Sequence, residues 1–221
     1  MSFTDLLKAT FLVISTLFPI VNPLGGSPIF LSMTGSYDAP ERRALSRLIG
    51  VNSFFLLIGS YLIGTHILAF FGISLPVVQV GGGLVVISTG WTMLQRGADD
   101  ERKEVHGHIQ RRDHSREAFY PFTLPLTVGP GSISVAITLG ANTPHGYPAN
   151  LTPIVGALIG SAAIGFTVYL CYGFADRLAR ILGPTAMSVI MRLSSFLLVC
   201  IGVQILWNGA TALLTSLSHG H

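Results

Sequence analysis

Apolar residues are concentrated in six long stretches of the chain, and short polar segments separate these stretches. A helix that crosses a hydrocarbon core of about 30 Å needs about 20 predominantly apolar residues. All six stretches satisfy this requirement; they cover residues 6–36, 48–71, 77–95, 118–141, 151–175 and 193–215. The pattern therefore predicts an all-α membrane protein with six transmembrane helices.

Two of the predicted spans contain residues that oppose a continuous helix. Residues 18–30 read FPIVNPLGGSPIF, and residues 120–133 read YPFTLPLTVGPGSI. Proline cannot donate to the helical hydrogen-bond ladder, and glycine weakens a helix. Both segments carry the spacing Pro-x-x-x-Pro followed by leucine. Helices 1 and 4 are therefore predicted to be discontinuous in equivalent places.

The two breaks belong to a longer internal repeat. At a spacing of 112 residues, Gly83 corresponds to Ser195 and Gly90 corresponds to Gly202. Each half then holds three spans, an odd number, so the second half enters the membrane from the opposite face. Such inverted repeats are common in secondary transporters. The predicted organisation is a first three-helix repeat, a cytoplasmic linker and a second three-helix repeat, at residues 1–95, 96–117 and 118–221.

Composition and charge support a membrane location and predict its orientation. Half of the 221 residues are apolar, 10% are charged and the mean hydropathy is +0.62, whereas a soluble domain has about 25% charged residues. The net charge of +3 does not indicate nucleic acid, because the basic residues do not share a face. Twelve of the 13 lysines and arginines lie on alternate loops, and only Lys8 lies on the other side. The positive-inside rule therefore predicts both termini outside, periplasmic or extracellular.

A pair of breaks at membrane depth predicts a binding site. Unwound backbone is tolerated there only where it is buried in protein or faces a polar cavity, so the breaks are expected to face each other. Each break is expected to restart a helix, with Ser27 as N-cap before Pro28 and Gly129 as N-cap before Pro130. A helix N-terminus offers free N–H donors and a partial positive charge to an anionic group. The alternative is a pair of proline kinks that serve packing alone.

The candidate substrate-binding residues lie in and beside these breaks. They are Asn22, Pro23, Gly25, Gly26, Ser27, Thr123, Thr127, Gly129, Pro130, Gly131 and Ser132. All ten carboxylates lie in loops or at helix ends. This placement argues against a cationic substrate, because a charge at the bilayer centre needs a partner. A zwitterion could bind instead, with its carboxylate at a helix N-terminus and its ammonium on freed carbonyls.

Other residue patterns indicate structure rather than chemistry. Small residues in the third and sixth helices predict close helix packing; they are Gly81, Gly82, Gly83, Gly90, Ser194, Ser195 and Gly202. Ser132 in GPGSIS would need a histidine at the same depth to act as a nucleophile, and His66, the histidine within a span, is expected at the interface. We expect no enzyme activity, metal site or cofactor, and proton and sodium both stay open as coupling ions.

Four motifs together resemble those of the MarC family of integral membrane proteins. They are NPLGG at residues 22–26, FGISLP at 71–76, PLTVGPGSI at 125–133 and FLLVCIGVQILWNG at 196–209. The resemblance implies a six-helix inner-membrane protein of bacteria or archaea, in a family named for a multiple-antibiotic-resistance locus and described as neutral amino acid transporters. It would give functional roles to Asn22, Pro23, Gly25, Gly129, Pro130 and Gly131. Gly81 and Ser195 depart from the family pattern, in which alanine and glycine are common at these positions.

The expected function is transport of a small neutral amino acid, such as glycine or alanine, by alternating access around the two breaks. The expected partners are this amino acid and the lipid bilayer, with no nucleic acid. One alternative is an exporter of another small metabolite or drug. Another is a channel without a coupled conformational cycle, which would give unsaturable flux where a carrier gives saturable counterflow.

Overall fold

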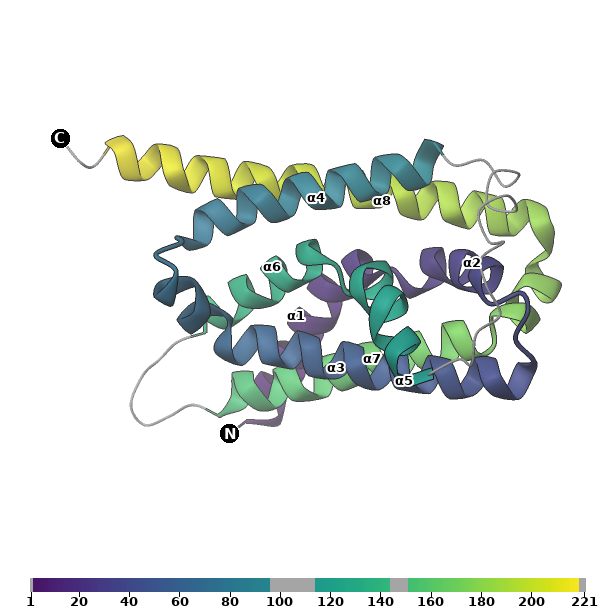
Figure 1. The fold of residues 1–221 in the computed structure, drawn as a ribbon. Helices are drawn as coiled ribbons and strands as arrows, with labels where there is room; N and C mark the ends of the chain where they lie inside the picture. Colours follow the sequence, from purple (N-terminus) through teal and green to yellow (C-terminus); the bar gives the residue numbers. More distant parts are fainter. Residues whose placement is uncertain (1, 96–113, 144–150, 219–221) are drawn as a thin grey trace.

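Long helices that run side by side make up most of the described protein (Figure 1). The structure, a computed structural model, describes residues 2–95, 114–143 and 151–218. Its helices are, in chain order, α1 (Phe3–Val21), α2 (Pro23–Met33), α3 (Ala39–Phe70), α4 (Leu75–Gln95), α5 (His114–Glu117), η2 (Ala118–Thr127), α6 (Pro130–Ala141), α7 (Thr152–Gly173) and α8 (Ala175–Ser218). The all-α fold that the apolar pattern predicts is confirmed.

The lengths and composition of the helices agree with a membrane protein. Five spans are long and apolar enough to cross a bilayer, and η2 with α6, a pair bent by 72°, raises the number to six. Large apolar side chains such as Phe11, Phe55 and Trp207 are exposed on the bundle, where lipid replaces water as the solvent. The start of α1 and the end of α8 lie at the same end of the bundle (Figure 1), as an even number of crossings requires.

Two helices extend beyond the apolar stretches that predicted them. α3 begins at Ala39, because a capping box fixes its start: the Glu41 N–H donates to Asp38 Oδ1 at 2.8 Å, and the Asp38 N–H donates to Glu41 Oε2 at 3.0 Å. α8 bends at Gly183, whose φ of 74° favours glycine. Its membrane span, Thr185–Leu217, follows this bend.

The helices form two outer layers with the broken spans between them. α4 packs along α8 in one layer and α3 packs along α7 in the other, while α1, α2, η2 and α6 lie between these pairs (Figure 1). α3 and α7 approach to backbone contact, since a Cβ added to Gly50 would lie 2.5 Å from the Gly165 carbonyl oxygen, and the reverse distance is also 2.5 Å. The broken spans therefore lie between two closely packed helix pairs.

Small residues bring α4 and α8 together as the sequence predicts. A Cβ added to Gly83 would lie 2.8 Å from the Gly202 carbonyl oxygen, and one added to Gly90 would lie 2.9 Å from the Ser195 carbonyl oxygen. Any side chain at either glycine would push the helices apart. Gly81 differs, because a Cβ added there meets no atom within 4 Å. The prediction of close packing is therefore confirmed for this pair of contacts and is wrong for Gly81.

A buried arginine ties the two halves together at the end of the bundle opposite the termini. Arg42 Nη2 donates to the carbonyl oxygens of Thr34 at 3.3 Å and Tyr37 at 3.0 Å. Its Nη1 lies 3.6 Å from Asp176 Oδ2, at the start of α8. One guanidinium therefore links the loop after α2, the start of α3 and the start of α8. We refer to this contact as the Arg42 tie.

The last residues of the predicted linker also join the fold. Residues 114–117 form α5, and the Tyr37 hydroxyl donates to the Glu117 carboxylate, which is half-buried. This short part of the predicted linker therefore packs on the first half through Glu117. Residues 96–113, the rest of the predicted linker, lie outside the described residues.

Candidate functional site

The first break consists of a single residue between two helices. α1 ends at Val21, Asn22 adopts the left-handed conformation with φ 46° and ψ 57°, and α2 begins at Pro23. Asparagine tolerates this conformation better than most residues. The Gly25 N–H donates to Asn22 Oδ1 at 3.1 Å, so Asn22 is the N-cap of α2. The predicted N-cap, Ser27, is wrong: it lies inside α2, because Pro23 already occupies the first helical position, where a missing N–H costs little.

The second break is longer and less regular. Within η2, Tyr120 (φ −128°, ψ 125°) and Leu124 (φ −106°, ψ 127°) are extended, as residues before proline tend to be. Two hydroxyls also bond to carbonyls of this segment: Thr123 Oγ1 donates to the Ala118 carbonyl at 2.6 Å, and Thr127 Oγ1 donates to the Phe122 carbonyl at 2.7 Å.

The helix after the second break begins where the sequence predicts. Gly129 is extended, with φ −89° and ψ 177°, and Pro130 occupies the first position of α6. The predicted N-cap at Gly129 is therefore confirmed. Because a glycine cap has no side chain to accept from the first N–H groups, those of Gly131 and Ser132 are left without an intrahelical partner.

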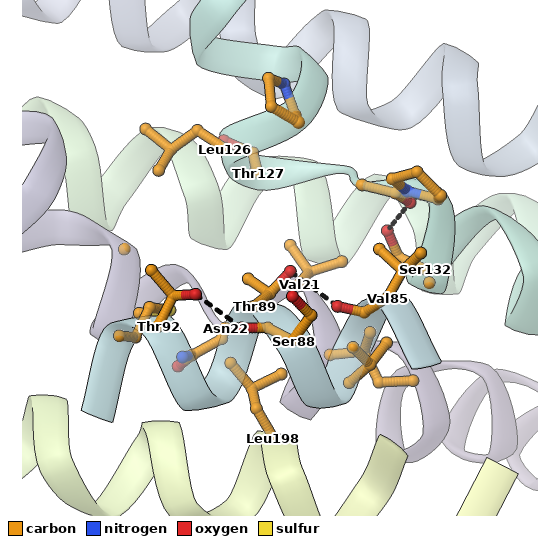
Figure 2. A pocket seen from close by; sticks show the side chains of 18 of the residues that line it. Val21, Asn22, Val85, Ser88, Thr89, Thr92, Leu126, Thr127, Ser132 and Leu198 are labelled. Atoms are coloured by element: carbon orange, nitrogen blue, oxygen red, sulfur yellow. Dashed lines mark hydrogen bonds between the residues drawn. The ribbon is translucent and has the colours of Figure 1, made fainter. Parts of the chain in front are cut away.

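A cavity of about 330 Å³ lies where the two breaks meet one face of α4 (Figure 2). Seven of the candidate residues line it: Asn22, Gly26, Thr127, Gly129, Pro130, Gly131 and Ser132. Four others do not line it: Pro23, Gly25, Ser27 and Thr123. These four are buried in the helices on either side, where they shape the breaks rather than the cavity wall.

The wall opposite the second break comes from α4, which sequence reasoning did not assign to the site. Ser88, Thr89 and Thr92 face the cavity from this helix, opposite Thr127 and Ser132 (Figure 2). Three hydroxyls within five residues of an apolar helix are a signal that could have indicated a polar wall. That signal is weak, because such hydroxyls usually bond to their own backbone.

The polar groups around the cavity are neutral. Among the described residues that line it, none is acidic, basic or histidine. Thr89 Oγ1 donates to the Val85 carbonyl at 2.9 Å and Thr92 Oγ1 donates to Ser88 at 2.8 Å, while Ser132 Oγ donates to Gly129. Each of these three hydroxyls therefore donates its hydrogen within its own helix, and its oxygen lone pairs can still accept a hydrogen bond from a ligand.

The first break differs in the backbone groups that it leaves available. Pro23 has no N–H to donate to the Pro19 carbonyl, and the Gly25 N–H goes to the Asn22 side chain instead of the Val21 carbonyl. This break therefore frees backbone acceptors and also holds the Asn22 Nδ2 donor without a partner, whereas the N-terminus of α6 offers N–H donors.

Tyr172, a buried residue of α7, contacts both broken spans. Its ring stacks on Phe30 of α2, with centroids 4.6 Å apart, and its hydroxyl lies 3.1 Å from Thr127 Oγ1. A Cβ added to Gly26 would lie 2.5 Å from the same hydroxyl. Gly26 thus allows α2 to approach α7, and the tyrosine couples the positions of the two breaks. Nothing in the sequence distinguishes this tyrosine from an ordinary core residue.

Comparison with known proteins gives the family. The sequence matches the family described as MarC family integral membrane protein over residues 7–214. The chain belongs to the MarC family. Similar proteins include the inner membrane protein MarC of Salmonella typhimurium, 32% identical over 211 residues that cover 93% of this chain and 95% of the relative. The inner membrane protein MarC of Escherichia coli is 30% identical over 210 residues, with the same coverage.

The family assignment confirms the resemblance seen in the motifs. As a MarC family member with five to six apolar spans, the chain is a multi-pass protein of the inner membrane. No solved structure matches the chain. The geometry of the site therefore rests on the contacts described above.

Proposed function

We propose that this MarC family protein transports a small neutral amino acid, such as glycine or alanine, by alternating access around the cavity between the two breaks. The observation that carries the proposal is the cavity itself: it lies at the junction of both breaks, and its polar groups are hydroxyls, an amide and free backbone groups. Its volume of about 330 Å³ is at the small end of ligand sites, which span about 300–1,000 Å³.

A zwitterion would use both sides of this cavity. We expect its carboxylate at the N–H groups of Gly131 and Ser132, where the positive end of the α6 dipole adds to the hydrogen bonds. Its ammonium would face the acceptors at the first break and the hydroxyl oxygens of α4. The bound solute would have no net charge, so the absence of charged side chains among the described lining residues fits it.

The packing partners of the helices support an inverted repeat. α1 and α2 pack on α7 and α8, while η2 and α6 pack on α3 and α4. The glycine contacts show the same exchange: Gly83 meets Gly202 and Gly90 meets Ser195, and adding 112 to 83 and 90 gives 195 and 202. Two related halves that rock against each other around a fixed site are a common basis for alternating access.

Binding and transport measurements on the purified protein test the proposal. We expect saturable calorimetric binding and counterflow in proteoliposomes for glycine or alanine, and neither for lysine or aspartate, because the cavity holds no balancing charge. Sodium and proton gradients, applied separately, identify the coupling ion. Unsaturable flux at single-channel rates would indicate a channel, and selective counterflow of a different metabolite or drug would indicate the exporter; either result would refute amino acid transport.

A matched pair of variants tests the cavity as the site. Thr89→Val removes a hydroxyl that lines the cavity, and we expect affinity to fall roughly 2- to 12-fold for the loss of one hydrogen bond of about 0.5–1.5 kcal/mol. Thr167→Val is the control, because Thr167 Oγ1 makes the same kind of intrahelical bond, to Ala163 at 2.8 Å, away from the cavity. Equal affinities for both variants and the wild type would place the site elsewhere.

A further inference from the structure

We infer that a second cavity, on the side of the breaks nearer the termini, is a vestibule that receives the same class of solute before it reaches the cavity at the breaks. This inference rests on the proposed function. The second cavity also measures about 330 Å³ and lies between α1, α4, α6 and α8. Its polar lining consists of Ser15, Thr16, Gln79, Thr138, Gln204 and Asn208. We refer to it as the outer cavity, and to the cavity at the breaks as the inner cavity.

The outer cavity gathers amide side chains that a lipid-facing surface would not hold. Gln204 Nε2 donates to Asn208 Oδ1 at 2.9 Å, and both residues lie one turn apart on α8 and are exposed. Their bond stays within one helix, so they do not join neighbouring helices in this chain. Each amide has two donors and an oxygen with two lone pairs, and one shared bond leaves most of these groups for water or a solute. Hydrocarbon would offer them no partner.

The walls that α1, α4 and α6 contribute to the outer cavity also carry uncharged polar side chains. Gln79 of α4 has its Nε2 3.4 Å from Thr138 Oγ1 of α6, while Ser15 and Thr16 face the cavity from α1. None of the described residues that line the outer cavity is charged. The cavity therefore suits a small polar molecule with no net charge, which is the class proposed for the inner cavity, and disfavours ions.

The linings of the two cavities share one residue, on the side of α1. Ile20, in the last turn of α1 before the break, lines both of them. On the other side, α4 and α6 close the passage by direct contact, since a Cβ added to Gly82 would meet Ser134 and one added to Gly131 would meet Val86. Ile20 and this helix contact therefore lie between the two cavities, and we expect removal of part of the isoleucine side chain to join them.

Cysteine accessibility tests the outer cavity without any amino acid. In a background carrying Cys171→Ala and Cys200→Ala, Thr16→Cys and Gln204→Cys are treated with a small, uncharged, hydrophilic methanethiosulfonate added from the face that carries the termini. Val203→Cys is the control, because Val203 neighbours Gln204 on the same helix, is exposed and does not line the cavity. We expect both test sites to react at least ten-fold faster than the control. Equal rates would overturn the vestibule.

The same variants also test whether Gln204 and Asn208 instead form a contact with a second copy of the chain. If Gln204 and Asn208 form a contact between copies of the chain, Gln204→Cys yields a covalent dimer under mild oxidation and reacts slowly with the reagent. That outcome would also overturn the vestibule. Monodisperse elution of every variant shows that the rates report on folded protein.

The partition is tested at Ile20 with a reporter in the inner cavity. In a Ser88→Cys background, we expect Ile20→Ala to accelerate modification from the face of the termini at least ten-fold, whereas Ile20→Met, which keeps the volume, leaves the rate unchanged. An unchanged rate in Ile20→Ala would show that Ile20 does not separate the cavities. These rates need no substrate, so failure of amino acid transport leaves them interpretable, and failure of the vestibule leaves the binding assay interpretable.

Discussion

The two breaks begin from similar sequences and end in different structures. Pro23 and Pro125 occupy equivalent places, as do Pro28 and Pro130, yet the helix restarts at Pro23 in the first break and at Pro130 in the second. The residue before the proline explains the difference. Asn22 can turn in the left-handed region and cap the next helix, whereas Leu124 takes an extended conformation and leaves the chain irregular for several residues.

Because of this difference, the two breaks leave different hydrogen-bonding groups unpaired at the inner cavity. The first break pairs the Gly25 N–H with Asn22 Oδ1 but leaves Asn22 Nδ2 buried without a partner, while the second leaves the N–H groups of Gly131 and Ser132 without a side-chain cap. A repeat that was symmetric in its local structure would offer two similar ends to the ligand. The observed pair differs in the backbone groups that it leaves unpaired.

The strongest test of the comparison is the direction in which each broken span crosses the membrane. Ser36 follows the first broken span and Asn142 follows the second, and both are exposed. Because the halves are predicted to be inverted, we expect cysteines at these positions to be labelled from opposite faces, Ser36→Cys from the cytoplasm and Asn142→Cys from outside. An impermeant maleimide in intact and in permeabilised cells measures this all-or-none effect. Labelling of both from the same face contradicts the inversion.

The next largest effect is expected at the donor side. Gly131→Val places a branched side chain against Val86 and over the N–H groups that would hold the carboxylate. Loss of one charge-assisted hydrogen bond, about 1.5–3 kcal/mol, lowers affinity roughly 10- to 150-fold, and overpacking costs a further 1–3 kcal/mol or so of stability. Calorimetry on the monodisperse fraction measures the affinity. Gly81→Ala is the control and should change stability by less than about 0.5 kcal/mol, because an added Cβ there meets nothing.

A smaller effect is expected where the tyrosine couples the breaks. Gly26→Ala brings a methyl group against the Tyr172 hydroxyl, and we expect a loss of about 1–3 kcal/mol in the free energy of unfolding. Tyr172→Phe removes the hydroxyl and should restore part of the stability of the alanine variant, with a coupling of about 0.5–3 kcal/mol. Denaturant unfolding of the double-mutant cycle measures it. Strict additivity would show that the two residues do not meet.

The smallest effect is expected at the self-capped break. Asn22→Ala loses the cap and puts alanine in the left-handed region, so we expect a loss of about 1–2 kcal/mol in the free energy of unfolding. Asn22→Gly keeps the conformation and should cost only a few tenths of a kcal/mol. Gly25→Val should act through the same cap, because its side chain would meet Asn22. If Asn22→Ala and Asn22→Gly are equally stable, the conformation of Asn22 does not matter.

The sequence predicts most of the fold because the membrane imposes simple rules. The all-α fold, the presence of long apolar spans and the Gly129 cap follow from apolar runs and proline positions, and each involves residues close together in the chain. Asn22 as the first cap was missed because Ser27 before Pro28 carries the same local signal. Local preferences do not decide between two adjacent signals of equal strength.

The parts of the site that were missed depend on distant contacts. Ser88, Thr89 and Thr92 face the breaks only because the glycines of α4 fix how that helix packs, and Tyr172 meets Gly26 and Thr127 across long sequence separations. In the sequence, a hydroxyl or a tyrosine in an apolar helix gives the same signal whether it faces lipid, core or cavity. Only the packing of the helices decides which of these it faces.

The Arg42 tie has a consequence for how quickly the proposed cycle can turn over. The Asp176 side chain is 35% exposed at the end of the bundle and the Arg42 side chain is 9% exposed, so water reaches the tie from the side of Asp176. The same ion pair at the bilayer centre would be far more costly to break, because each charge would then lack both partner and solvent. The contacts between α4 and α8 in the interior are made by glycines and carry no charge. If the proposed cycle opens the tie, salt should act on that step, because exposed charges are screened.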